Sequence, residues 1–314
     1  QYFGIDIGGT AVKLGIVDET GKVLCKGEQS VNFDGYQTPV LDTVRKAAKE
    51  FLTAQAIPVE NLSGIGVSAT GQIDSRKGIV AGTCGNFPNY IGSPIKAALE
   101  QDFGLPVTVA NDANCMTLGE VWVGAAQGYT DVIGVTLGTG VGGGIIANGQ
   151  LVRGVHFTAG EYSFVNTNAD EWENTEKTMA CQCSTKYLLK WYRARKGLPA
   201  DAPMNGKLFF DAANAAEPEA LEVLERFCKM VAVQIYNLTV LLDVEKVAIG
   251  GGISKQPLLL DDLRRVYAGL FASRGESPYM IGLPRCEIVP CHFSSEANQV
   301  GALYTYLQAE SKTI

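Results

Sequence analysis

Apolar and polar residues alternate near the start of the chain with the period of a half-buried β-strand. Val12, Leu14 and Ile16 are apolar, and Lys13 and Gly15 lie between them. The polar sequence DETGKV then supplies a turn before the next apolar segment. Three strands are therefore expected at the start of the chain, over residues 2–7, 12–18 and 22–29.

From about residue 38 the apolar residues recur every three or four positions, which is typical of an amphipathic helix. A longer stripe of this kind runs from Leu224 to Leu242. Helices are expected over residues 38–52, 93–101, 113–125 and 224–242, and from about residue 295. Strands are expected over residues 63–71, 106–112, 131–140, 142–152, 245–254 and 286–290. Strands that alternate with helices in this way are typical of an α/β protein.

The two halves of the chain repeat one pattern, because each begins with a glycine-containing hairpin and continues into strands and helices. No Pro/Ser-rich linker separates the halves. We therefore expect an α/β protein of two similar lobes. The first lobe would cover residues 1–115 and would be completed by a C-terminal helix at about 296–314, and the second would cover residues 116–295.

Composition and charge restrict the class of protein. The chain has 314 residues, of which 46% are hydrophobic and 19% charged, and this suits a globular protein with a substantial core. Its formal net charge of -7 argues against a general nucleic-acid surface. No apolar run is long enough for a membrane span, and no signal peptide is apparent before the first strand. The eight cysteines are scattered, so we expect them to be reduced and the protein to be cytoplasmic.

Three glycine-rich loops are the first candidates for chemistry. Gly8, Gly9 and Thr10 lie between two expected strands, where glycine permits a positive φ and leaves backbone N–H groups uncovered. Such groups can hold phosphate oxygens, although an ordinary tight hairpin would also explain the sequence.

The second loop, residues 138–143, fits the pattern G-x-G-x-x-G. A dinucleotide site needs a helix after that pattern, whereas Ile145 and Ile146 continue a strand here, so we exclude a Rossmann site. No Walker P-loop sequence occurs either. The third loop, Gly250 to Gly252, follows a buried strand and leaves a bare backbone for a ribose or base. Together the three loops predict phosphate and nucleotide binding.

Asn111 and Asp112 stand where an expected strand ends and a helix begins. Both residue types cap helices well, so a purely structural role is open. The carboxyl end of a parallel strand is also where α/β proteins place ligands. An aspartate there can act as a general base toward an attacking hydroxyl.

The motifs DIGGT, NDAN, GTGVGGGII, AGE and GGG occur in this order along the whole chain. With these motifs the chain resembles the ROK family (repressors, open reading frames and sugar kinases) of the actin/hexokinase-like superfamily. The resemblance implies two lobes of the actin/hexokinase-like ATPase fold, with ribonuclease H-like lobes, that bind ATP, Mg²⁺ and a sugar.

The resemblance also implies roles for particular residues. Asp112 would be the base that activates a sugar hydroxyl, and Asp6 would lie near the magnesium ion and the phosphates. The phosphates would be held by Gly8, Gly9, Thr10, Lys13, Gly138, Thr139 and Gly140, and the adenosine would be flanked by Gly250, Gly251 and Gly252. The sugar would be bound by Gly71, Asn86, Asn111, Asp112 and Glu161. Asn86 could instead be a turn residue, and Glu161 a solvated charge.

The chain departs from the family at its zinc motif. Many ROK proteins carry a histidine in AGEIGH and three cysteines in CxCGxxGC, whereas this chain has Phe164 and Leu188 at two of those four positions. It keeps Cys181 and Cys183. A structural zinc needs four ligands, so we expect none, and a rearranged site that uses His156 is the alternative. Tyr162 and Phe164 would make the sugar pocket more aromatic, as in family members that phosphorylate β-glucosides.

We therefore expect an ATP-dependent sugar kinase that phosphorylates a hexose or hexoside at O6, as a glucokinase or a β-glucoside kinase does. An N-acetylmannosamine or fructose kinase is the alternative within the class, and a non-catalytic sugar-sensing ROK protein is the alternative outside it. A repressor would carry a winged helix–turn–helix before the first loop, which begins at residue 6 here. We expect a homodimer that binds neither nucleic acid nor membranes.

Overall fold

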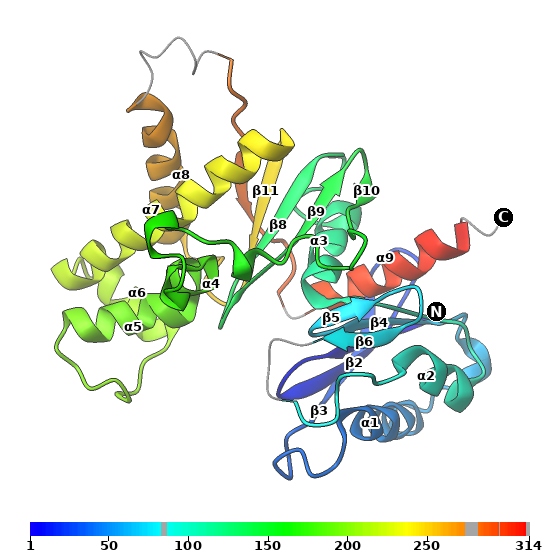
Figure 1. Cartoon of the computed structure of the whole chain (residues 1–314). Coiled ribbons are helices and arrows are strands. Elements are labelled where there is room, and N and C mark those ends of the chain that lie inside the picture. The colour runs from blue at the N-terminus through cyan, green and yellow to red at the C-terminus, as the bar shows by residue number, and fades with distance from the viewer. Residues whose placement is uncertain (83–86, 274–281, 295, 312–314) are drawn as a thin grey trace. The chain divides into compact units, whose positions relative to one another are not determined.

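Figure 1 shows the computed structural model, which describes residues 1–82, 87–273, 282–294 and 296–311. The chain forms two compact units. The first consists of Gln1–Gly128, Leu151–Ala159 and Ser295–Ile314, and the second of Tyr129–Gln150 and Gly160–Ser294. This division differs from the boundary expected near residue 115, because helix α3 continues from Asp112 to Val123 without a break. The return of 151–159 to the first unit was not anticipated from the sequence.

The first unit contains a five-stranded sheet in the order β3-β2-β1-β4-β7. Its strands are β1 (Tyr2–Ile7), β2 (Ala11–Val17), β3 (Val23–Ser30), β4 (Ile65–Ala69) and β7 (Val107–Asn111). The first three form an antiparallel meander, and β4 and β7 run parallel to β1. Ile7 lies opposite Ala69, which lies opposite Asn111, so the carboxyl ends of β1, β4 and β7 share one edge of the sheet.

Helices cover both faces of this sheet (Figure 1). Its helices are α1 (Val40–Ala54), α2 (Ile95–Phe103), α3 (Asp112–Val123) and α9 (Ala297–Ser311), with the short turn η1 (Val59–Asn61) and the hairpin of β5 (Gln72–Asp74) and β6 (Ile79–Gly82). Phe3 stacks on Phe51 of α1, whereas Gly4 and Asp6 of the same strand face α9. Strand β1 therefore sends its apolar residues to one helix layer and its carboxylate to the other.

Helix α9 packs very closely on α3 and on the sheet. A Cβ atom at Gly301 would lie 1.7 Å from the backbone oxygen of Cys115, and one at Gly66 would lie 2.6 Å from the backbone of Ala302. Glycine is required at both positions because backbone atoms, rather than movable side chains, occupy the space. The close approach makes α9 an integral layer of the first unit.

The second unit repeats the strand order of the first, as β10-β9-β8-β11-β12. Its strands are β8 (Val132–Leu137), β9 (Val141–Ala147), β10 (Gln150–Leu151), β11 (Lys246–Gly250) and β12 (Glu287–Pro290). Again an antiparallel pair, β8 and β9, precedes two strands parallel to β8 in the sheet. The carboxyl ends of β8 and β11 lie together, because Gly250 pairs with Thr136.

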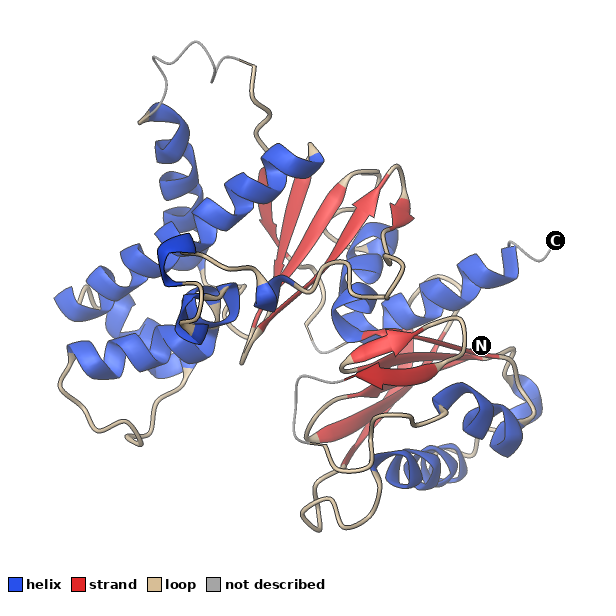
Figure 2. Ribbon diagram, viewed as in Figure 1, coloured by secondary structure: helices blue, strands red, loops and turns tan. Residues whose placement is uncertain are grey.

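The helices of the second unit lie together beside its sheet (Figure 2). They are α4 (Met179–Cys183), α5 (Thr185–Arg195), α6 (Gly206–Asn214), α7 (Pro218–Leu242) and α8 (Pro257–Ala272), with the short turns η2 (Tyr162–Phe164), η3 (Ala169–Glu171) and η4 (Thr175–Lys177). The predicted stripe of α7 is buried at Leu224, Phe227, Val231 and Ile235. None of the helices in the described part of the chain has both the length and the apolar character that a membrane span requires.

Candidate active site

Asp6 places a buried carboxylate near the carboxyl end of β1. Its side chain accepts hydrogen bonds from Ser68 Oγ at 2.8 Å and from Asn298 Nδ2 at 3.0 Å, and both bonds end on Oδ1. Burial raises the pKa of Asp6, while these two bonds and the positive charge of Lys13, its neighbour across the β1–β2 ladder, oppose the shift. Sequence reasoning found Asp6 and Lys13 but missed Ser68 and Asn298.

The first glycine loop is a tight hairpin, in which Gly8 N donates to Ala11 O at 2.9 Å. Glycine would permit a positive φ here, but neither Gly8 nor Gly9 adopts one. Space explains the glycine at position 9, because a Cβ atom there would lie 2.8 Å from the ring of Phe87. Thr10 is exposed at the turn. The carbonyl oxygens of Gly9 and Thr10 accept from the Tyr36 hydroxyl and from Val31 N, which hold the hairpin in place.

Asn111 and Asp112 occupy the junction of β7 and α3. Asn111 caps the helix, since its Oδ1 accepts from Asn114 N at 3.1 Å. Its amide also donates to the carbonyl oxygen of Gly71 at 2.9 Å, and Gly71 has a φ of 90°. Asp112 is half-buried at the first helical position, and its Oδ1 accepts from Ala113 N at 2.8 Å. The junction therefore has a structural role in addition to any chemistry.

The carboxylates of Asp6 and Asp112 both raise the pKa of the same two buried side chains, Tyr90 and Cys115. Burial raises the pKa of Tyr90, and the negative charges of Asp112 and Asp6 raise it further. Burial likewise raises the pKa of the Cys115 thiol, followed by the same two charges. Asp6 and Asp112, at the carboxyl edge of the sheet, are therefore both close enough to Tyr90 and Cys115 for their charges to act on these side chains. Asn86 lies outside the described residues.

The second glycine loop, Gly138 to Gly140, connects β8 directly to β9, as the exclusion of a Rossmann site required. Its backbone is open, because a Cβ atom at Gly138 would meet nothing nearer than 3.9 Å. One at Gly140 would lie 3.4 Å from Ser163 Oγ. Thr185 at the start of α5 fixes the base of the loop by donating its hydroxyl to Leu137 O at 2.8 Å.

The third glycine loop packs on the base of the second. Gly251 has a φ of 99°, and a Cβ atom there would lie 2.3 Å from Leu137 O. Gly250 ends β11, and Gly252 has nothing within 4 Å of the position of a Cβ atom. The second unit thus has open backbone at Gly138 and at Gly252. The close contact between Gly251 and Leu137 joins the two loops next to these positions.

Glu161 follows β10 in the second unit and is half-buried. Burial raises the pKa of its carboxyl. Within the described part of the chain, no hydrogen bond or ion pair reaches this carboxylate. A partly desolvated carboxylate without such a partner is suited to accept hydrogen bonds from ligand hydroxyl groups.

Tyr162, next to Glu161, is only 3% exposed, and a Cβ atom at Gly143 would lie 2.0 Å from its ring. The expectation that Tyr162 makes the sugar pocket more aromatic is therefore wrong, because its ring belongs to the core beneath β9. Phe164 differs sharply, since 68% of it is exposed. Only Phe164 of this pair has a ring face that a ligand could reach.

The region of the degenerate zinc motif is apolar where the motif is lost. Leu188 is fully buried, and Cys183 of α4 is buried in the same core cluster, which raises the pKa of its thiol. His156 belongs to the first unit, whereas Cys181 and Cys183 belong to the second. Among the described residues, no three His, Cys, Asp or Glu side chains are grouped closely enough to hold a metal ion.

The sequence profile of the ROK family matches residues 2–309. The chain belongs to the ROK family. A β-glucoside kinase of Listeria innocua is 32% identical over 311 residues, which cover 98% of this chain and 97% of that relative. This match spans both units, so the family assignment concerns the whole described chain.

Solved structures agree with the assignment. A ROK family glucokinase of Streptomyces griseus, in complex with glucose and AMPPNP, is 26% identical, with a TM-score of 0.79 over 98% of this chain and 99% of that chain. A ROK family protein of Streptococcus pneumoniae, in complex with sucrose, is 28% identical, with a TM-score of 0.84 over 99% of each chain. The predicted actin/hexokinase-like fold is confirmed.

Proposed function

We propose that the chain is an ATP-dependent sugar kinase that transfers the γ-phosphate of ATP to O6 of a hexose or hexoside. The observation that carries the proposal is the pair of carboxylates, Asp6 and Asp112, at the carboxyl edge of a sheet whose first hairpin has the exposed Thr10 at its turn. The kinase names of the relatives support it, as does the glucose and AMPPNP bound by one of them.

The residues fit the cofactor and the nucleotide. Carboxylate oxygen is the ligand that Mg²⁺ prefers, and Asp6 would hold this ion, which neutralises charge on the phosphates when bound. The open backbone at Gly138 and Gly252 would let a nucleotide approach it closely. The N–H groups of Gly9 and Thr10 and the hydroxyl of Thr10 would be the donors to phosphate oxygens, since the N–H of Gly8 donates to Ala11 O.

Asp112 acts as the general base in the proposed reaction. Its carboxylate accepts the proton of the sugar O6 hydroxyl, the bond between O6 and the γ-phosphorus forms, and the bond from the γ-phosphorus to the bridging oxygen of ADP breaks. Asn111, in the same unit as Asp112, hydrogen-bonds another hydroxyl of the sugar, and Glu161 is the sugar-binding carboxylate that we propose for the second unit. Asn111 already donates to Gly71 and accepts from Asn114, so its role toward the sugar uses its remaining hydrogen-bonding capacity.

A coupled assay of ADP release over a panel of sugars tests the proposal. Glucose, mannose, N-acetylmannosamine, fructose, cellobiose and methyl β-glucoside would be compared with ATP and Mg²⁺ alone. We expect sugar-dependent ADP release with at least one hexose or hexoside, and a 6-phosphate as the product by NMR. Absence of sugar-dependent release across the panel would favour the non-catalytic alternative, which direct calorimetry of sugar binding would then reveal.

A further inference from the structure

The loop that follows β3 reaches back to the first glycine hairpin. The hydroxyl of Tyr36 donates to Gly9 O at 2.5 Å, and both residues belong to the first unit. Asp34 closes the loop around Tyr36, because its Oδ2 accepts from Thr38 N at 3.0 Å and from the Thr38 hydroxyl at 2.7 Å. The turn that carries Tyr36 is therefore closed by its own side chains and tied to the hairpin.

Tyr36 adopts a backbone conformation that bulky residues avoid. Its φ is 62°, and that of Gly35 before it is 69°. Glycine enters this left-handed region freely, whereas an aromatic residue does so at a cost in free energy. Such strain persists only where the surrounding contacts hold it, and it is concentrated at functional sites. The strain at Tyr36 therefore directs attention to what its side chain contacts.

Phe87 packs against both the Tyr36 ring and the hairpin. The rings of Tyr36 and Phe87 meet edge to face with their centroids 5.7 Å apart, and Phe87 makes the same kind of contact with Tyr90 at 5.7 Å. A Cβ atom at Gly9 would lie 2.8 Å from the tip of the Phe87 ring. Burial raises the pKa of Tyr90, and the charges of the two proposed catalytic carboxylates raise it further. The three rings thus connect the Tyr36 loop and the hairpin to the carboxyl edge of the sheet.

The hairpin has its acceptors occupied and two of its donors free. The carbonyl oxygens of Gly9, Thr10 and Ala11 each accept a hydrogen bond from within the first unit. In the part of the chain that the structure describes, no hydrogen bond uses the N–H of Gly9 or the N–H of Thr10. A turn with this pattern favours an anion, because only its positive dipole ends are available to a ligand.

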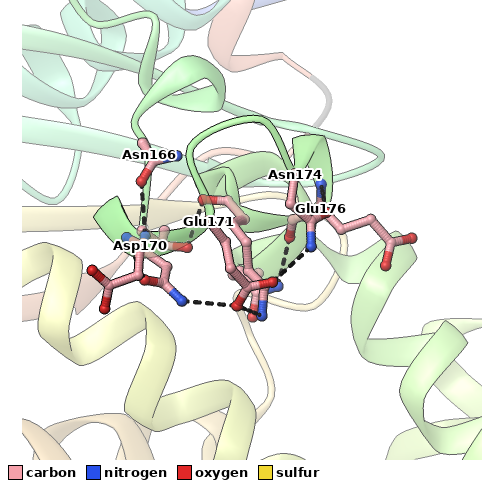
Figure 3. A network of polar contacts seen from close by, with 9 residues as sticks. Asn166, Asp170, Glu171, Asn174 and Glu176 are labelled. Carbon is pink, nitrogen blue, oxygen red and sulfur yellow. Dashed lines mark hydrogen bonds and ion pairs between the residues drawn. The ribbon is translucent and has the colours of Figure 1, made fainter.

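A polar network in the second unit has a different pattern (Figure 3). The Glu171 carboxylate accepts from the amides of Asn168 and Asn174, each at 2.9 Å, and pairs with Lys177 at 2.9 Å. Asn174 Oδ1 in turn accepts from Glu176 N at 3.1 Å. These groups are satisfied by one another, which accounts for them as the framework of a loop. The free donors of the hairpin have no such account within the first unit.

We infer that Tyr36 is a positioning residue for the phosphates of ATP and acts through the peptide between Gly9 and Thr10, an inference that rests on the proposed kinase function. A trans peptide is planar, so its C=O and N–H bonds point in opposite directions. Because Tyr36 holds the carbonyl oxygen of Gly9, the N–H of Thr10 points away from the tyrosine. Glycine at position 9 leaves this peptide easy to rotate, and the Tyr36 hydroxyl selects one orientation. The donor is then already oriented when a phosphate oxygen arrives, which lowers the cost of ordering it on binding.

Tyr36→Phe tests the inference, because it removes the hydroxyl and keeps the ring. The KM for ATP, the KM for the best sugar and kcat would be measured beside Tyr306→Phe, a matched control whose hydroxyl donates to Ser63 O at 3.0 Å in the same unit. We expect Tyr36→Phe to raise the KM for ATP roughly three- to tenfold, as the loss of one hydrogen bond does, and to leave the KM for the sugar within about twofold. Tyr306→Phe should change neither KM.

Binding without turnover separates this inference from the proposed function. Calorimetry would compare the ATP analogue AMPPNP, with Mg²⁺, and adenosine for the parent protein, Tyr36→Phe and Tyr36→Ala. We expect Tyr36→Phe to weaken AMPPNP binding by about the same factor as it raises the KM for ATP, and to leave adenosine binding unchanged. This result would support the inference even where no sugar is phosphorylated.

Two outcomes would overturn this inference alone, even where the kinase assay succeeds. Equal losses of AMPPNP and adenosine affinity in Tyr36→Phe, with a fall in Tm beyond that of Tyr306→Phe, would mean that the hydroxyl only stabilises the unit. AMPPNP affinity that is retained in Tyr36→Phe and lost in Tyr36→Ala would assign the effect to packing of the ring on Phe87. A parent protein that does not bind AMPPNP would overturn both proposals.

Discussion

Replacing Asp112 with asparagine separates two duties of this side chain. In the structure, Asp112 Oδ1 accepts from Ala113 N at 2.8 Å, and an asparagine oxygen can accept the same bond. The substitution removes a negative charge from the first turn of α3, where such a charge contributes about 0.3–1 kcal/mol. We therefore expect the free energy of unfolding to fall by no more than about 1 kcal/mol.

The effect on turnover should be much larger. The amide cannot accept the proton of the sugar hydroxyl, and a general base contributes roughly two to four orders of magnitude, or about 3–5.5 kcal/mol of activation free energy. The measurements are kcat with the best sugar of the panel and urea unfolding of the same preparations. Sugar affinity by calorimetry should change little compared with kcat.

A matched control is available on α1. Asp42 is exposed in the first turn of that helix, so Asp42→Asn removes the same charge from an equivalent place without touching the carboxyl edge of the sheet. It should lower stability about as much as Asp112→Asn and leave kcat unchanged. A kcat of Asp112→Asn within a few-fold of the parent would refute the reasoning and remove Asp112 from the mechanism.

Three other predictions follow from the structure. Gly251→Ala should lower the free energy of unfolding in urea by at least about 2 kcal/mol, because Gly251 has a φ of 99° and a Cβ atom there would lie 2.3 Å from Leu137 O. Gly252→Ala should lower it little, because the position of its Cβ atom is open. Equal effects of the two substitutions would contradict this prediction. Hydrogen bonds from Arg45, and then from Lys49, lower the pKa of Asp102 to about 2. Asp102→Asn should therefore lower the free energy of unfolding by about 2 kcal/mol near neutral pH. The difference from the parent protein should disappear as the pH falls from about 4 to 2, because Asp102 is then protonated in both states. Elemental analysis should find no stoichiometric zinc and chelators should not change Tm, since a structural zinc contributes on the order of 10 kcal/mol.

The sequence predicted the fold best where a periodic pattern was long. Val12, Leu14 and Ile16 are buried as their alternation indicated, and the stripe of α7 faces the core. No element was predicted between residues 165 and 215, where the structure has α4, α5 and α6. Helix α4 has five residues, which is too short to repeat an apolar period even twice.

The sequence offers candidate site residues where the chemistry is local, and it does not reveal partnerships across the chain. Glycine loops and a carboxylate at a strand end can be recognised from a few neighbouring residues. The donors to Asp6 come from Ser68 and Asn298, which are 62 and 292 positions away, and no short motif reports such pairs. The motif also does not show why position 9 needs glycine, which is that the ring of Phe87 leaves no room for a side chain there.

The place of α9 in the first unit has a consequence for biosynthesis. All of the second unit is translated between Gly128 and Ala297, and at 5–20 residues per second this takes roughly ten to thirty seconds. During that interval the sheet lacks α9 on the face that carries Asp6, although the second unit can already collapse on its own core. The nascent chain therefore emerges from the ribosome with its first-made unit the last to close, and a chaperone that shields that face has a defined period in which to act.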